Sequence, residues 1–212
     1  RLNQTLGVEI EKDETQIYKI SANSGDFFRI VVRQKNADVS LKLLSPKNEI
    51  LVETDNSDSP EEPERMSFIA AETGEFSVQV KGTKVWNAAG DFEIKLDTLR
   101  PSADRDKSRI EAEKLYNQAV SDWFSGKPDA KNLAVKAFSE SLPLFQTAED
   151  GFGEAFARYY LGVLYRLLND APKSIESLAR SAQIFREIKA FPQLARALSN
   201  GEIYQSATEL VS

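Results

Sequence analysis

The most informative absences are those of cysteine and histidine, neither of which occurs among the 212 residues. Without cysteine the chain forms no disulfide, and without both it lacks Cys/His zinc sites, Cys-His dyads and Ser-His-Asp triads. Long apolar runs are missing too, because no segment approaches the roughly 20 residues that a membrane-spanning helix needs. We therefore expect no cofactor and no membrane span.

An excess of basic charge is also missing. The sequence holds 27 Lys and Arg against 33 Asp and Glu, which gives a net charge of -6. Nucleic-acid binding is not expected, because phosphate neutralisation needs clustered Lys and Arg. Residues 1–98 carry 18 acidic and 12 basic side chains, whereas residues 99–212 carry 15 of each. This asymmetry predicts two units with different surfaces.

Alternating apolar residues are plentiful in residues 1–98. Every second residue is apolar in EFSVQVKG (75–82), as it is in VSLKLLS (39–45) and DFEIKLDT (91–98). Turn sequences such as NSGD, SPKN and ETGE separate these runs. Short alternating strands with turns between them predict an antiparallel β-sandwich or barrel. We expect about seven or eight strands and a jelly-roll-like sandwich over 1–98.

After residue 98 the pattern changes from two-residue alternation to helical spacing. Residues 99–106 are polar, contain a proline and predict a linker. From Lys107 onward apolar residues recur at three and four positions, so residues 107–212 are expected to be all helical. The predicted helices cover 107–124, about 130–148, 152–169 and 172–189, with a further one from Pro192.

The helical part repeats itself when it is shifted by 40 residues. This shift pairs small residues with small ones, as Ala134 with Ser174, and large with large, as Phe138 with Leu178. Fixed-period similarity is typical of stacked helical pairs. Gly162 in the middle of a helix costs about 1 kcal/mol relative to alanine. We expect the next helix to approach closest at this glycine, where a side chain would hold it away.

Within 157–185 the sequence resembles a tetratricopeptide repeat, although Arg158 stands where that motif usually has tryptophan. The matching positions are Leu161, Gly162, Tyr165, Ser174, Leu178 and Ser181. The resemblance implies an α-helical solenoid whose groove binds a peptide or a partner domain. By analogy with the motif, the partner-binding residues are Phe156, Tyr159, Tyr160, Val163, Arg166, Arg196, Asn200 and Ile203. The alternative for Phe156 and Tyr160 is packing against neighbouring helices.

Residues 5–98 resemble the bacterial pre-peptidase C-terminal (PPC) domain. The matching positions are Tyr18, Gly25, Asp38, Leu41, Leu43, Pro46, Gly74, Phe76, Val78 and Val80. In addition, LPL (142–144) before an acidic, glycine-containing turn resembles the repeats found upstream of CHAT domains, which are caspase-like. Together these resemblances imply the N-terminal part of a larger bacterial CHAT-type protein, with a downstream peptidase domain as one possible partner. They favour a periplasmic or secreted location.

An acidic segment, ETDNSDSPEEPE (53–64), makes Asp55 and Asp58 candidate calcium ligands. It has no glycine for the sharp bend of a calcium loop, so a solvated acidic loop is the ordinary interpretation. The last helix ends without a clear polar cap, which predicts continuation of the array or self-association through that helix.

The favoured function is a non-catalytic scaffold for protein-protein interaction. The alternative is a carbohydrate- or matrix-binding module, in which Trp86 on a loop stacks on a sugar and the helices act as a spacer. An enzyme that uses carboxylates alone is a third hypothesis, and it would need two facing acids in a cleft.

Overall fold

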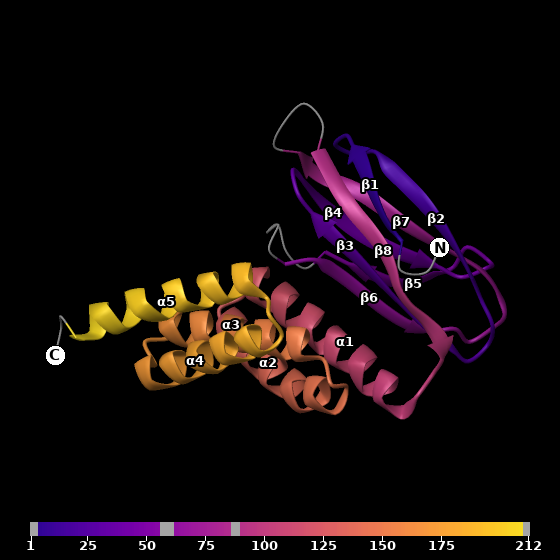
Figure 1. Ribbon diagram of the computed structural model, residues 1–212. Coiled ribbons are helices and arrows are strands. Elements are labelled where there is room, and N and C mark those ends of the chain that lie inside the picture. The colour runs from indigo at the N-terminus through magenta and orange to yellow at the C-terminus, as the bar shows by residue number, and fades with distance from the viewer. Residues whose placement is uncertain (1–3, 56–61, 86–89, 210–212) are drawn as a thin grey trace. The chain divides into compact units, whose positions relative to one another are not determined.

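The computed structural model describes residues 4–55, 62–85 and 90–209, with side chains described up to Asn200. The chain divides into two units, Arg1–Asp106 and Lys107–Ser212. The first unit is built from strands and the second from helices (Figure 1). Of the segment 99–106, expected to be a linker, residues up to Pro101 belong to the last strand and residues from Asp104 to the first helix.

The described part of the β unit contains two four-stranded antiparallel sheets. One sheet has the order β1 (Thr5–Ile10), β8 (Gly90–Pro101), β3 (Asp26–Gln34) and β6 (Glu64–Ile69). The other has the order β2 (Thr15–Ala22), β7 (Gly74–Val85), β4 (Ala37–Leu44) and β5 (Ile50–Thr54). Consecutive strands mostly lie in different sheets, so the chain crosses between the sheets repeatedly.

The core of the β unit joins both sheets. Alternate residues of β3 and β7 are buried, because successive side chains of a strand point to opposite faces. Phe28 on β3 and Phe68 on β6 belong to one sheet, and Phe76 on β7 belongs to the other. Their ring centroids lie 5.6 to 6.1 Å apart. This aromatic contact ties the sheets together through side chains.

The helical unit comprises α1 (Asp104–Phe124), α2 (Ala130–Thr147), α3 (Gly151–Leu167), α4 (Ala171–Glu187) and α5 (Phe191–Glu209), of which α1 begins in the last residues of the β unit. The turns after α2, α3 and α4 share one geometry. Glu149, Asn169 and Lys189 each have a positive φ, of 53°, 61° and 59°. In the first two turns the next residue, Asp150 or Asp170, caps the following helix by accepting a hydrogen bond from a backbone N–H.

The prediction of a tetratricopeptide-like solenoid is wrong. The helices pack as a helical region around one hydrophobic cluster, which extends from Ala112 on α1 to Ala197 on α5. Tyr160 on α3 contacts Tyr116 and Trp123 on α1, so side chains reach beyond the next helix in the chain. No clear solenoid is seen in the described residues, and the fold is one of mixed β and α structure. The self-similarity of the sequence reflects similar turns and small residues at the helix contacts. Two antiparallel helices joined by a short turn need both features, whether or not they belong to a solenoid.

The expectation of a close approach at Gly162 is confirmed. A Cβ atom there would lie 2.6 Å from Cγ of Leu178 and 3.2 Å from the carbonyl oxygen of Ser174 on α4. The hydroxyl of Ser174 donates to the carbonyl oxygen of Gly162 at 2.8 Å, and that of Ser181 donates to Ala155 at 2.8 Å. The serines of α4 therefore hydrogen-bond to the backbone of α3 where the two helices are closest.

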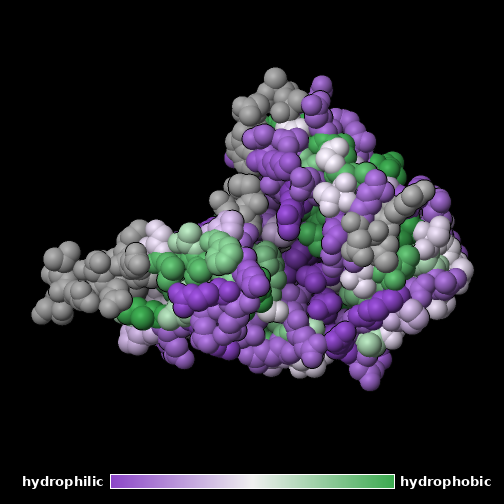
Figure 2. Space-filling model, viewed as in Figure 1, coloured by the Kyte–Doolittle hydropathy of each residue, from purple (hydrophilic) through white to green (hydrophobic). Residues whose placement is uncertain are grey.

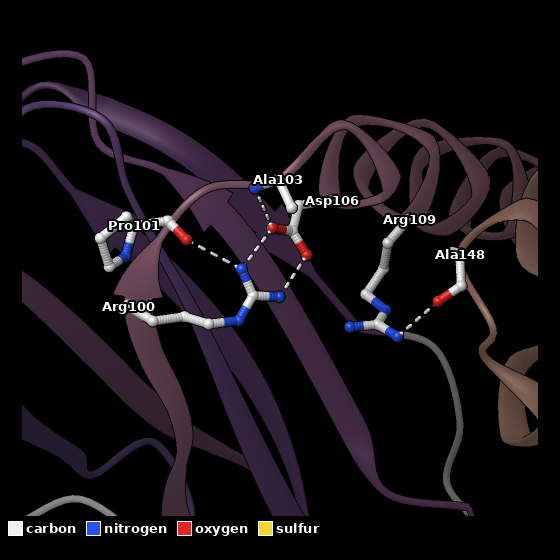
Figure 3. A network of polar contacts seen from close by, with 6 residues as sticks. All are labelled: Arg100, Pro101, Ala103, Asp106, Arg109 and Ala148. Atoms are coloured by element: carbon white, nitrogen blue, oxygen red, sulfur yellow. Dashed lines mark hydrogen bonds and ion pairs between the residues drawn. The ribbon is translucent and has the colours of Figure 1, made fainter.

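The start of α1 is held by a buried carboxylate (Figure 3). Asp106 is fully buried and accepts hydrogen bonds from both terminal nitrogens of Arg100, at 2.7 and 2.8 Å, and from the backbone N–H of Ala103 at 2.7 Å. The hydrogen bond with Asp106 raises the pKa of Arg100 despite the opposing effect of desolvation. Bidentate pairing of this kind fixes geometry as well as adding energy, so it ties the end of β8 to the first turn of α1.

A second polar contact lies within the helical unit. Arg109 on α1 donates to the carbonyl oxygen of Ala148 at 2.9 Å (Figure 3). Its Nε lies 3.3 Å from Oδ2 of Asp150. Oδ1 of Asp150 accepts from the backbone N–H of Gly153 at 3.0 Å. Asp150 therefore caps α3 and anchors α1 to the turn between α2 and α3.

Candidate binding surface on the helical unit

Helical spacing places several predicted partner-binding residues on two neighbouring stripes. On α3, Tyr159, Val163 and Arg166 follow one another at four and three residues, so they share one face of the helix. On α5, Arg196 and Asn200 are four residues apart and share a face in the same way. The tertiary structure brings these two faces together.

Four of these side chains form one hydrogen-bonded group, called here the Tyr159 cluster: Tyr159, Arg166, Arg196 and Asn200. The Tyr159 hydroxyl accepts from Nε of Arg196 at 3.0 Å and from Nδ2 of Asn200 at 3.2 Å. Oδ1 of Asn200 accepts from Arg166 at 3.2 Å. The guanidinium carbon of Arg196 also lies 4.8 Å from the centre of the Tyr159 ring. The cluster links two helices through residues that are 34 to 41 positions apart in sequence.

The cluster is only partly covered by the rest of the helical unit. Tyr159 is buried, whereas Arg166, Arg196 and Asn200 are half-buried and reach the surface. A cation over an aromatic ring gains roughly 0.5–2 kcal/mol, depending on how far it is desolvated. The contacts hold the long side chains of Arg166 and Arg196 in defined positions. Binding of a partner would therefore cost less side-chain entropy.

The remaining predicted residues are placed differently. Phe156 is 1% exposed and packs against Phe152 and Phe185, so its assignment to a binding surface is wrong. It faces the core because it lies on the side of α3 that contacts α4. Tyr160 and Val163 are partly buried against the same core, and Tyr160 stacks on Phe138 at 5.5 Å. The side chain of Ile203 lies outside the described residues.

The candidates in the β unit gain no geometric support. Asp55 is exposed, and Asp58 and Trp86 lie outside the described residues. In the ranges that the structure describes, no group of three or more acidic residues is arranged to hold a metal ion.

Most of the shifted pKa values belong to charge pairs, whereas burial raises the pKa of Tyr18. A side-chain hydrogen bond from Lys173 lowers the pKa of Asp170, and the same contact raises the pKa of Lys173. At Asp97 burial alone would raise the pKa, but the hydrogen bond and charge of Lys95 hold it below its usual value. The hydrogen bonds and charges at Asp97, Asp170 and Lys173 favour the charged forms of these groups and move each pKa away from neutral pH. A general acid or base needs a pKa close to the working pH.

Sequence reasoning missed two features of the structure. It did not anticipate that Tyr159 would bond to α5, since no local pattern records which helix faces meet. It also missed a cavity on the outer face of the β2-β7-β4-β5 sheet, although the alternating polar residues Ser40, Lys42, Gln79 and Lys81 mark that face in the sequence.

Among the described residues, no helix is both long and apolar enough to cross a membrane. No family model and no curated protein matches this chain. Among solved structures, the chain is similar to Aeromonas hydrophila PliG, a periplasmic lysozyme inhibitor of g-type lysozyme. The identity is 11%, the match covers 47% of this chain and 87% of that chain, and the TM-score is 0.33.

Proposed function

We propose that this chain is a non-catalytic binding region and that its helical unit binds a peptide or a partner domain at the Tyr159 cluster. The observation that carries the proposal is the hydrogen-bonded network of Tyr159, Arg196, Asn200 and Arg166 across α3 and α5. Tyrosine and arginine are enriched among the residues that dominate binding energy at protein interfaces.

The chemistry of the cluster favours binding over catalysis. Guanidinium groups are permanent donors with a fixed fork geometry, and an amide both donates and accepts. Such groups recognise backbone carbonyls and carboxylates of a peptide. Arginine does not exchange protons near neutral pH, so Arg166 and Arg196 offer no general acid or base.

The proposal is tested by probing an array of random peptides, each about twelve residues long, which is enough to cover several side-chain sites of a typical interface. Wild-type protein is compared with Arg196→Ala and Tyr159→Phe, the second of which removes only the acceptor hydroxyl. We expect selected peptides to lose roughly tenfold or more in affinity for both variants, as loss of a charged hydrogen bond produces.

The matched control is Arg186→Ala, which removes an exposed arginine from the last turn of α4. It should leave peptide binding unchanged. The proposal fails if no peptide binds above background, or if selected peptides bind Arg196→Ala as tightly as wild type while that variant melts at the wild-type temperature.

Self-association through α5 is a separate part of the proposal. Hydrophobic side chains come to the surface around the start of this helix, where Figure 2 shows green atoms. Ile188, Phe191 and Leu198 are 41%, 61% and 38% exposed. Sedimentation equilibrium of wild type and Phe191→Ser tests this, and a wild-type monomer at all concentrations contradicts it. The resemblance to CHAT-type proteins makes a caspase-like domain a candidate partner for either surface.

A further inference from the structure

Polar groups are regularly spaced on the outer face of the β2-β7-β4-β5 sheet. On β7, Gln79 and Lys81 alternate with buried Val78 and Val80, and on β4 Ser40 and Lys42 alternate with buried Leu41 and Leu43. The registers place Thr15 opposite Lys81 and Lys81 opposite Ser40, and they also place Gln79 opposite Lys42 and Lys42 opposite Glu53. Polar side chains therefore form two adjacent rows across the strands.

An open cavity of about 420 Å³ lies on these rows. It is lined by side chains from every strand of the sheet, including Thr15, Ser40, Lys42, Glu53, Gln79 and Lys81. Its volume falls within the range of roughly 300–1,000 Å³ that is usual for small-ligand sites. The floor is a hydrogen-bonded sheet, so the lining groups are held by the register of the strands.

The charges of the cavity are compensated within the protein. Nζ of Lys42 lies 2.6 Å from the carboxylate of Glu53, and Nζ of Lys81 lies 3.3 Å from that of Asp13. A polyanion would meet carboxylates beside each of these lysines. A divalent cation would meet Asp55 as well as Glu53 in the lining, but it would have to displace the Lys42 ammonium from Glu53. The cavity thus offers many donors and acceptors but little net charge.

A ligand that matches such a surface is uncharged and carries groups that both donate and accept hydrogen bonds. Hydroxyl groups do this, and they pair with ammonium, carboxylate, amide and hydroxyl partners alike. Ile17 on β2 is opposite Gln79 in the register and is 56% exposed. It extends the row of Gln79, Lys42 and Glu53 with an apolar side chain next to the residues that line the cavity. Sugar rings combine hydroxyl edges with apolar C–H faces.

We infer that the outer face of the β2-β7-β4-β5 sheet is a binding site for a neutral oligosaccharide. Lys42, Glu53 and Gln79 form its centre, and Thr15, Ser40 and Lys81 form the neighbouring row. The site lies on a sheet face, at a different place from the Trp86 loop, and it is independent of the peptide-binding proposal for the helical unit.

The inference is tested by calorimetric titration of the full chain with maltohexaose, cellohexaose and chitohexaose. We expect at least one of them to bind with a dissociation constant in the range of about 0.1–1 mM, which corresponds to a few net hydrogen bonds. Gln79→Ala and Lys42→Ala should each weaken that binding by roughly tenfold. Backbone NMR shifts caused by the sugar should centre on β4 and β7.

The matched control is Lys19→Ala on β2. Lys19 pairs with Glu75 at 3.5 Å as Lys42 pairs with Glu53, but it does not line the cavity. This variant should bind the sugar like wild type. The inference is overturned if none of the three sugars binds at about 10 mM, which is well above the expected dissociation constant. Binding that survives both Gln79→Ala and Lys42→Ala, or stronger binding of a sulfated oligosaccharide than of the neutral ones, would also overturn it.

Discussion

The core between the two sheets and the contact between α3 and α4 are packed in opposite ways. In the β unit the sheets are separated by large side chains such as Phe28, Phe68 and Phe76, since packed sheets lie about 10 Å apart. In the helical unit α3 and α4 approach so closely at Gly162 that a methyl group would overlap Leu178. The β core therefore depends on the volume of its side chains, whereas the α3–α4 contact depends on their smallness.

This difference extends to buried polar groups. In the sheets the backbone N–H and C=O groups are largely used by neighbouring strands. Between α3 and α4, buried Ser174 and Ser181 donate to carbonyl oxygens that already accept hydrogen bonds within their own helix. A serine side chain is small enough to fit between the two helices, and its hydroxyl group finds a hydrogen-bond acceptor there. The buried hydroxyl groups of Ser174 and Ser181 are therefore satisfied.

The largest effects are expected from removing a ring in each core. Phe28→Ala and Phe156→Ala should each reduce the free energy of unfolding by about 3–5 kcal/mol, because both rings are almost fully buried. Peptide-resolved hydrogen exchange should locate the lost protection in the strands for Phe28→Ala and in the helices for Phe156→Ala. A loss below about 1 kcal/mol for Phe156→Ala would return this residue to the surface role predicted from sequence.

Adding a methyl group should distinguish the tight α3–α4 contact from an open position on β1. Gly162→Ala is expected to lose about 1–3 kcal/mol of stability through overpacking against Leu178, in spite of its better helix propensity. Gly7→Ala on β1 is the matched control, because its Cβ would meet no atom within 4 Å. That variant should change stability by less than about 1 kcal/mol, with a stabilising sign. Equal melting temperatures for the two variants would refute the comparison.

A smaller effect is expected from removing a buried hydroxyl group on α4. Ser174→Ala should reduce the free energy of unfolding by about 0.5–1.5 kcal/mol, since it removes a hydrogen bond but preserves the small volume. Urea denaturation measures the change. Ser177→Ala on the same helix, which is only half-buried, serves as the comparison and should change stability by less than about 0.5 kcal/mol. Similar losses in the two variants would mean that the bond from Ser174 to Gly162 does not stabilise the contact.

The smallest effect is expected from replacing one carboxylate in each unit, which should change how the stability depends on pH in acid. The folded pKa values of Asp97 in β8 and Asp170 before α4 are lowered. Each carboxylate therefore adds stability above the unfolded pKa of about 3.9, and this is lost as the pH falls through that value towards the folded pKa. Asp97→Asn and Asp170→Asn should each reduce the loss of stability as the pH falls. In Asp170→Asn the new side chain can still cap α4, so that the charge is the main change. Urea midpoints over a pH series measure this, and an unchanged acid limb in both variants would contradict it.

Local patterns predicted where the strands and helices lie, but not how the helices associate. The residues of the Tyr159 cluster were predicted by analogy with the repeat motif, yet Phe156 from the same set is buried. Spacing gives the face of a helix on which a residue lies, whereas the neighbouring helix decides whether that face is covered. The predicted solenoid failed for the same reason, because similar hairpins are compatible with more than one packing arrangement.

The sequence by itself determined the two-residue alternation of the strands, the helical spacing after residue 98 and the need for a small residue at Gly162, since each depends on neighbours close along the chain or on one contact. Only the tertiary structure decided that Tyr159 bonds to Arg196 and Asn200, and that Lys42, Gln79 and Glu53 share one row of a sheet. Those groupings depend on strand register and on the angle between helices, which are set by packing over the whole unit.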